Sequence, residues 1–324
     1  MTKRVHVYIG GMLLILTLLG LSACPNRTES PLRLGTNVWP GYEPLYLARE
    51  LGYFNAKTIT LVEYLSASEV IRAFRNQTLE AAALTLDEVL LLLQYELPVQ
   101  IFLVTDISHG GDVILSAPSI SQFADLVGKR VGVEATALGA YVISRALEQH
   151  DLALSDIAVV PLEVGEHAAA YQAGKVDAVV TFEPVRSQLL ALGARELFTS
   201  REIPGEIVDV LVVHQTYFET HPSHVSQVVD GWFRALDYFA ANPHDAALRM
   251  QKRLKLSPGE VLKSYEGLRL PDRAENRDLL GGPQPALRPI AERLRDVMVA
   301  KDLLRAPVVL NSLFNAAALG EDPS

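Results

Sequence analysis

Short apolar runs rich in β-branched residues alternate along the chain with longer segments in which apolar residues recur every three or four positions. The first pattern is typical of buried strands, and the second is typical of amphipathic helices. Up to residue 105 these patterns predict strands at 32–38, 58–65, 80–84 and 99–105, with helices at 43–51, from 66 onward and at 87–95. This alternation predicts an α/β fold with a mainly parallel sheet covered by helices.

The alternation continues after residue 110 and then gives way to helices. Further strands are predicted at 112–116, 129–133, 157–162, 176–182 and 207–213, and helices at 121–127, 138–150, 166–173 and 185–192. From residue 217 onward the pattern is mostly helical, at about 217–241, 243–254, 257–266 and 286–304. Glycines such as Gly52, Gly174 and Gly193 follow predicted helices at the position where a helix commonly ends.

The first residues have the order of an export signal. Lys3 and Arg4 precede an uncharged apolar run at 5–21, which leads through small residues into Cys24. A cysteine at this place resembles a bacterial lipoprotein signal, so we expect residues 1–23 to be removed and Cys24 to be acylated. The alternative is a membrane-spanning helix, for which the run is at the lower length limit. Residues 24–31 are polar and flanked by proline, as in a short tether.

Composition limits what the remaining chain can do. Cys24 is the only cysteine in 324 residues, so neither a disulfide nor a cysteine-based metal site is expected. The net charge of −9 argues against nucleic acid as a partner. The sequence also lacks the P-loop, GxGxxG, GxSxG and HExxH motifs, and no cofactor or metal is expected.

Candidate ligand-binding residues follow from the predicted sheet, because open α/β sheets bind ligands at the carboxyl ends of their strands, near helix N-termini. The residues at such ends and at the chain crossings include Asn37, Trp39, Tyr42, Ser66, Thr85, Ser108, His109, Gly110, Thr136, Glu183 and Asp209.

Each type of candidate also has a purely structural alternative. The hydroxyl residues Ser66, Thr85 and Thr136 are helix caps on any account. Trp39 either packs under its loop or forms an aromatic wall with Tyr42. Glu183 either binds a ligand amine or braces the hinge. In the same way, Asp209 either contacts ligand or braces a crossing strand, and His109 is either a ligand contact or a surface loop residue.

Five segments resemble, in order and spacing, the bacterial periplasmic solute-binding proteins for nitrate, taurine, aliphatic sulfonates and thiamine-pyrimidine precursors. They are GTNVWPGYEPLYLARELGYF (35–54), DISHGGDVIL (106–115), KRVGVEATALGAY (129–141), GKVDAVVTFEP (174–184) and IPGEIVDVLVV (203–213). The resemblance implies a two-lobed clamshell of the second periplasmic-binding-protein type. Lobe one would contain 32–107 and 208–324, and lobe two 108–207. The two crossovers, near Ser108 and Val208, would form the hinge.

The resemblance also implies partners and a location. The protein would be a monomer that is lipid-anchored on the periplasmic side of the cell membrane, captures a small solute between its lobes and delivers it to an ABC permease. A sensory protein of the same shape, feeding a membrane signalling partner, remains an alternative. A related fold serves a pyrimidine-forming enzyme, but that enzyme would need a cysteine-rich segment, so we expect no enzyme activity.

The charges of the candidate positions indicate the kind of solute. They include carboxylates but neither Arg nor Lys. A simple oxyanion such as nitrate would be repelled there, whereas an amine or a nitrogen-containing ring could face the carboxylates and stack on Trp39 or Tyr42. We therefore expect a small organic solute, either a zwitterionic sulfonate or a pyrimidine-like ring.

Overall fold

The computed structural model describes residues 30–134 and 137–320. The predicted signal segment, Cys24 and Thr136 therefore lie outside the described residues. The chain divides into two compact units, Met1–Pro31 and Leu32–Ser324, and the fold below is that of the second. Within the described ranges, no helix combines the length and the apolar character needed to cross a membrane.

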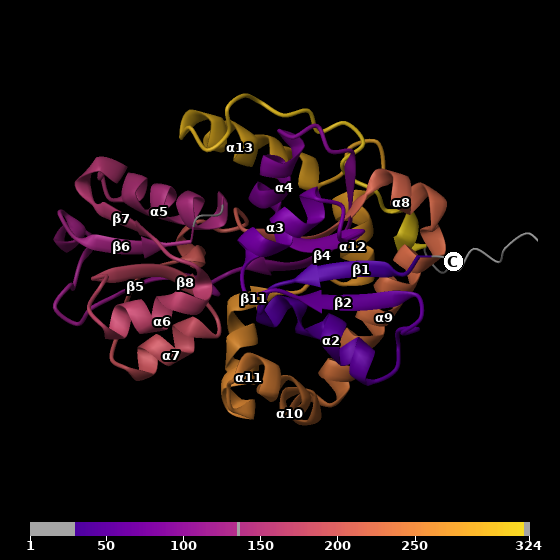
Figure 1. Ribbon diagram of the computed structural model, residues 1–324, viewed down its shortest axis with the longest axis horizontal. Helices are drawn as coiled ribbons and strands as arrows, with labels where there is room; N and C mark the ends of the chain where they lie inside the picture. The colour runs from indigo at the N-terminus through magenta and orange to yellow at the C-terminus, as the bar shows by residue number, and fades with distance from the viewer. Residues whose placement is uncertain (1–29, 135–136, 321–324) are drawn as a thin grey trace, which may run out of the picture. The chain divides into compact units, whose positions relative to one another are not determined.

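The first sheet has six strands in the order β11-β4-β10-β3-β1-β2 (Figure 1). Their bounds are β1 (Leu32–Thr36), β2 (Ile59–Glu63), β3 (Ala81–Thr85), β4 (Val99–Ser108), β10 (Val208–His214) and β11 (Leu268–Arg269). Strands β1 to β4 run in one direction, and β10 and β11 run against them. We call this sheet and the helices packed on it lobe one.

The second sheet has five strands in the order β7-β6-β8-β5-β9. They are β5 (Asp112–Ser116), β6 (Arg130–Val133), β7 (Ala158–Pro161), β8 (Ala178–Phe182) and β9 (Arg195–Thr199). Only β5 runs opposite to its neighbours β8 and β9. We call this sheet and its helices lobe two. The chain passes from lobe one to lobe two between β4 and β5 and returns between β9 and β10.

The helices surround both sheets, as Figure 1 shows. The α-helices are α2 (Glu43–Glu50), α3 (Ala67–Arg75), α4 (Leu86–Leu93), α5 (Ala137–Gln149), α6 (Val164–Gln172), α7 (Val185–Ala191), α8 (Gln215–Thr220), α9 (Pro222–Ala241), α10 (Pro243–Leu254), α11 (Pro258–Ser264), α12 (Arg273–Leu280) and α13 (Leu287–Ala300). Short 3-10 turns are η1 (Pro40–Tyr42), η2 (Phe123–Leu126), η3 (Leu154–Asp156), η4 (Ser200–Glu202), η5 (Tyr265–Gly267) and η6 (Ala317–Leu319).

The predicted α/β fold with mainly parallel sheets is confirmed, with local differences that have physical causes. The single helix expected at 217–241 is two helices, because Pro222 occupies the first turn of α9 and its ring fits there without an N–H. The segment at 121–127 forms only the 3-10 turn η2. Strands β9 and β11 were not predicted. Strand β9 begins with exposed charged residues, and β11 has two residues, so neither has a clear apolar period.

Asn276 of α12 satisfies backbone groups of β4 that β11 is too short to reach. The amide of Val104 donates to Asn276 Oδ1 over 2.7 Å, and Asn276 Nδ2 donates to the Val104 carbonyl over 3.1 Å. The side chain is fully buried and acts as a short substitute for a neighbouring strand. Beside it, the pairing of β4 with β10 shifts register between Asp209 and Val210, next to the crossing between lobes.

We expect Asn276→Ala to lower the free energy of unfolding by about 3 kcal/mol, because it leaves a buried N–H and a buried C=O of β4 without partners. Urea unfolding of purified protein measures this change. Asn311→Ala, at an exposed position, is the matched control and should change stability by less than about 0.5 kcal/mol. Equal stability of the two variants would contradict the role assigned to Asn276.

Candidate functional site

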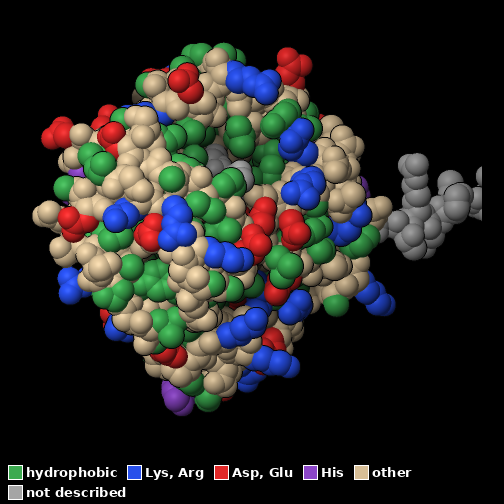
Figure 2. All heavy atoms as spheres, turned by 60° about the vertical axis from the view of Figure 1, so that its left-hand side comes forward, with side chains coloured by type: hydrophobic (Ala, Val, Ile, Leu, Met, Phe, Trp, Pro, Cys, Tyr) green, Lys and Arg blue, Asp and Glu red, His purple; other side chains and the backbone are tan. Residues whose placement is uncertain are grey.

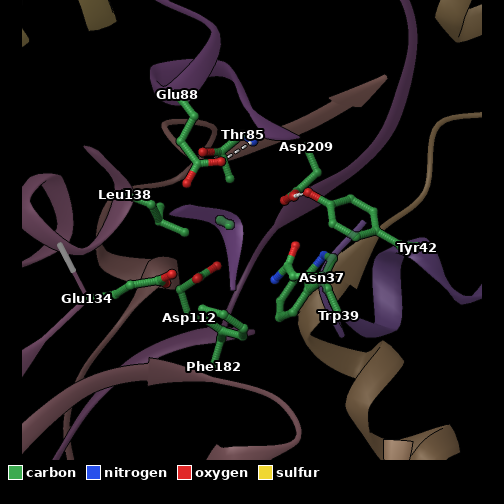
Figure 3. A pocket seen from close by; sticks show the side chains of 11 residues that line it. Asn37, Trp39, Tyr42, Thr85, Glu88, Asp112, Glu134, Leu138, Phe182 and Asp209 are labelled. Atoms are coloured by element: carbon green, nitrogen blue, oxygen red, sulfur yellow. Dashed lines mark hydrogen bonds between the residues drawn. The ribbon is translucent and has the colours of Figure 1, made fainter. Parts of the chain in front are cut away.

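A cavity of about 320 Å³ lies between the two lobes, where strands of both sheets end or begin (Figure 3). The lining residues come from both lobes and are Asn37, Trp39, Tyr42, Ala67, Thr85, Glu88, Asp112, Glu134, Leu138, Phe182 and Asp209. All except Leu138 are buried.

The charge of the lining differs from that of the outer surface. Among the described residues, the lining has four carboxyl side chains and neither Lys, Arg nor His. On the face seen in Figure 2, by contrast, Lys and Arg side chains lie interspersed with Asp and Glu. The cavity is therefore a local concentration of acidic groups, and no cationic side chain of the described residues lies at the lining to neutralise them.

Two aromatic side chains of lobe one are oriented by a pair of carboxyl groups at the crossing strands. Asp106 of β4 and Asp209 of β10 are register partners. Trp39 Nε1 donates to Asp106 Oδ2 over 3.2 Å, and the Tyr42 hydroxyl donates to Asp209 Oδ1. Each aromatic ring thus has its polar edge fixed by the protein, which leaves the ring surfaces for other contacts.

Phe182 of lobe two completes the aromatic part of the lining. Its ring meets that of Trp39 edge to face, with 5.5 Å between the ring centroids. Phe182 is the last residue of β8, and Trp39 lies just before the 3-10 turn η1. The contact therefore joins the two lobes at the cavity wall, in a geometry that aromatic pairs favour.

The two aspartates cannot both be ionised at neutral pH. Burial raises the pKa of the Asp106 carboxyl to about 7. Burial and the neighbouring Asp106 charge hold the pKa of Asp209 well above its usual range. Two like charges that are close together and shielded from water repel each other strongly. The pair of Asp106 and Asp209 therefore retains a proton near pH 7.

Three other lining carboxyls each have an oxygen that lacks a hydrogen-bond partner in the described part of the chain: Glu88 Oε1, Asp112 Oδ2 and Glu134 Oε1. Burial raises the pKa of Asp112 and of Glu134 to about 7, and it holds the pKa of Glu88 well above its usual range. A buried acceptor without a donor is costly. A solute that brings N–H donors or positive charge would satisfy these oxygens.

Several residues predicted from the sequence lie together in this cavity: Asn37, Trp39, Tyr42, Thr85 and Asp209. Other candidates lie apart from the lining. Ser66 caps α3 by accepting from the Glu69 amide over 3.3 Å. Glu183 accepts from Arg186 and from the Ser187 amide, beside its own strand end.

The remaining candidates belong to the crossing between the lobes. The hydroxyls of Ser108 and Ser200 are hydrogen-bonded over 2.8 Å, and the Gly110 amide donates to the same Ser200 hydroxyl. His109 is exposed. Thr136 lies outside the described residues.

Six lining residues were absent from the set of candidates: Ala67, Glu88, Asp112, Glu134, Leu138 and Phe182. Glu88 could have been predicted from the sequence, because Thr85 and Glu88 have the spacing of a capping box. In the structure the Thr85 amide donates to Glu88 Oε2 over 3.1 Å. Glu134 lies directly after a predicted strand and was visible as a strand-end carboxylate.

We expect Asp112→Asn to stabilise the solute-free protein increasingly as pH rises from about 4 to 7. The unfolded carboxyl ionises near pH 4, whereas the folded one does so at about 7, so wild-type stability falls through this window relative to the variant and the difference is constant above it. Melting temperatures of both proteins across pH 4–8 measure this difference, and groups common to both cancel.

Asp177→Asn is the control of opposite sign. Its hydrogen bonds with Arg130 lower the pKa of Asp177, so this variant should lose stability relative to wild type above pH 4. If the melting temperatures of both aspartate variants change in the same direction relative to wild type as pH rises, the assignment of Asp112 as a buried acid with a raised pKa is wrong.

This chain resembles known proteins in sequence and in fold. The taurine-binding periplasmic protein of Escherichia coli (strain K12) is 23% identical over 190 residues, which are 57% of this chain and 59% of that protein. The chain thus matches about 59% of the length of this relative.

Solved structures share the fold. The alkanesulfonate-binding protein SsuA from Xanthomonas axonopodis pv. citri, bound to MOPS, superposes with a TM-score of 0.75 at 19% identity, covering 88% of this chain and 98% of that one. The desulfurization enzyme DSZB gives 0.63 at 19% identity, covering 89% and 97%. The fold therefore serves both binding proteins and an enzyme.

The sequence profile described as the NMT1-like family matches residues 26–253, which is more than half of the chain. The resemblance to periplasmic solute-binding proteins that the five segments predicted is confirmed. The chain belongs to the NMT1-like family.

Proposed function

We propose that this protein is the solute-capturing component of an ABC importer, which encloses a small organic solute between its two lobes and performs no chemistry on it. The observation that carries the proposal is the cavity whose lining comes from both lobes. The taurine- and alkanesulfonate-binding relatives support it.

Capture would require the lobes to part and close again. The lining side chains are almost all buried, so parting of the lobes would expose them to a solute. The lobes are joined by two chain crossings, after β4 and before β10, and separation about such crossings is the hinge motion of binding proteins. A closed, loaded protein would then dock on a membrane permease.

The charge of the cavity supports a solute that carries an amine or an aromatic nitrogen. Glu88, Asp112 and Glu134 each present an oxygen without a partner among the described residues. Trp39 and Phe182 supply an aromatic surface next to them. A zwitterionic sulfonate and a pyrimidine-like ring both have a nitrogen that can meet the carboxyls, whereas nitrate has none.

Tryptophan fluorescence should report solute binding, because the chain has two tryptophans and only Trp39 lines the cavity. In a Trp232→Phe background, which leaves Trp39 as the sole tryptophan, we expect taurine or an aminopyrimidine to change the tryptophan emission saturably. Nitrate should do so at no less than tenfold higher concentration. Loss of the response in Asp112→Asn would locate the binding. Tight nitrate binding with no response to the two nitrogen bases would contradict the proposed solute class.

We also propose that the mature protein is held at the periplasmic side of the cell membrane by lipid on Cys24. The order of basic, apolar and small residues before this sole cysteine supports the anchor. A single acyl chain gives only reversible membrane binding, so stable attachment takes a second membrane-binding signal.

When the full chain is produced in a bacterium, Cys24→Ser should move the protein from the membrane fraction to the soluble extracytoplasmic fraction, or leave it uncleaved. The check is immunoblotting of fractions together with palmitate labelling. A variant such as Ser22→Ala, which keeps a small residue and the cysteine, is the control and should remain membrane-bound. Equal labelling of Cys24→Ser and wild type would rule out the anchor.

A further inference from the structure

The segment between β1 and α2 carries several of the residues that line the cavity. We call residues 37–42 the binding loop, since Asn37, Trp39 and Tyr42 all belong to the lining. Hydrogen bonds to the crossing strands fix the polar ends of the Trp39 and Tyr42 side chains. These bonds hold one end of each side chain, so the orientation of the two rings also depends on what holds the backbone of the loop.

Two donors from the C-terminal helical region hold this backbone. The Tyr265 hydroxyl donates to the Pro40 carbonyl over 2.7 Å, and Arg253 Nη2 donates to the Asn37 carbonyl over 3.2 Å. The Pro40 carbonyl also accepts the Glu43 amide of the local turn. Among the described residues, neither donor side chain belongs to the cavity lining. The loop is thus held at its start and in its middle by residues 216 and 225 positions away in the sequence.

Arg253 is itself fixed by several partners. It forms an ion pair with Glu63 of β2, and its guanidinium carbon lies 3.4 Å from the centroid of the Tyr46 ring. Its Nε lies 3.1 Å from the buried Glu43 Oε1, as an ion pair without hydrogen-bond geometry. Because these partners already order the guanidinium, little further freedom is lost when it binds the Asn37 carbonyl.

Tyr265 is fixed through the turn that it begins, η5. Its ring packs on Phe239, with 4.6 Å between the ring centroids. In the same turn, the Gly267 carbonyl accepts from the His109 amide over 2.8 Å, and the following strand β11 pairs with β4. A Cβ added at Gly267 would lie 2.9 Å from the Gly111 nitrogen, so the turn and the crossing are in close backbone contact. Tyr265 therefore links the binding loop to the place where the chain leaves lobe one.

We propose that Tyr265 and Arg253 are positioning residues, which set the orientation of Trp39 by holding the backbone of the binding loop. This inference rests on the proposed solute capture and adds to it two residues outside the cavity. A wall that the protein has already ordered does not have to be ordered by the solute, and the entropy cost of such ordering would weaken binding. The affinity for solute therefore depends on two side chains that do not line the cavity.

The first test measures the motion of Trp39 in the absence of solute. Tyr265→Phe removes one hydroxyl and keeps the ring that packs on Phe239. In a Trp232→Phe background, Trp39 is the sole tryptophan, and time-resolved anisotropy of its emission reports how freely it moves. We expect the fast component of the anisotropy decay to be at least twice as large in Tyr265→Phe as in the parent, because the loop has lost one of its two distant donors.

The second test measures affinity by calorimetry, in proteins that keep Trp232. Tyr265→Phe and Arg253→Gln should each bind taurine or the aminopyrimidine, whichever of them wild type binds, about fivefold more weakly, in keeping with the loss of one net hydrogen bond. Arg253→Gln also removes the ion pair of the buried Glu43. Thermal melting verifies that each variant is folded, and if Arg253→Gln does not fold, Tyr265→Phe decides the matter alone.

Tyr238→Phe and Arg249→Gln are the matched controls. Both residues lie in the same helical region, and both donate to Asp245 instead of to the loop. Each control makes the same chemical change as one test variant. Both should keep the affinity and the fast anisotropy component within about twofold of their parents.

The outcomes separate this inference from the proposed function. If the fast component of Tyr265→Phe equals that of its parent, Tyr265 does not position the loop, whatever the protein binds. If the component grows while the affinity stays within twofold of wild type, the orientation of the loop does not govern binding, and the inference is again overturned. If wild type binds neither taurine nor the aminopyrimidine, the solute class of the proposed function fails, while the anisotropy of the solute-free proteins still decides the role of Tyr265.

Discussion

The removal of several carboxyl groups from water, with no cationic side chain of the described residues beside them at the cavity lining, is the constraint on which the rest of the site depends. Desolvation raises the pKa values of Asp106, Asp112 and Glu134 to about 7. A charged group that is neither solvated nor paired destabilises a folded protein by several kcal/mol. The folded protein can therefore accommodate the cavity in two states: either the carboxyl groups are protonated, or a solute with several hydrogen-bond donors lies between them.

The fold provides hydrogen-bond donors at fixed positions for two of the buried carboxyl groups. The antiparallel pairing of β4 with β10 sets Asp106 opposite Asp209, and each receives one aromatic donor from the segment after β1. These bonds orient Trp39 and Tyr42. They also hold the segment between β1 and α2 against the two strands that cross between the lobes. The same groups that make the cavity acidic thus also build its aromatic wall, so electrostatics and shape are not independent features of this site.

Sequence periodicity could predict most strands, most helices and five of the cavity residues, because parallel strands bring their carboxyl ends to one edge and that rule is local. It could not place Phe182 against Trp39, because this contact crosses between the lobes and depends on how the lobes close. Glu183 illustrates the opposite limit. It lies at a strand end as predicted, yet Arg186 and Ser187 of the next turn bind its carboxyl locally.

The structural relatives show why the charge of a few side chains, and not the backbone, should decide the solute. At 19% identity, the same lobes accommodate an alkanesulfonate-binding protein and a desulfurization enzyme. A helix start that faces a cavity favours an anion. Carboxylates placed in the same cavity oppose that preference without moving a strand. In this chain Glu88, Asp112 and Glu134 line the cavity, and the fold alone therefore cannot transfer the ligand of a relative to it.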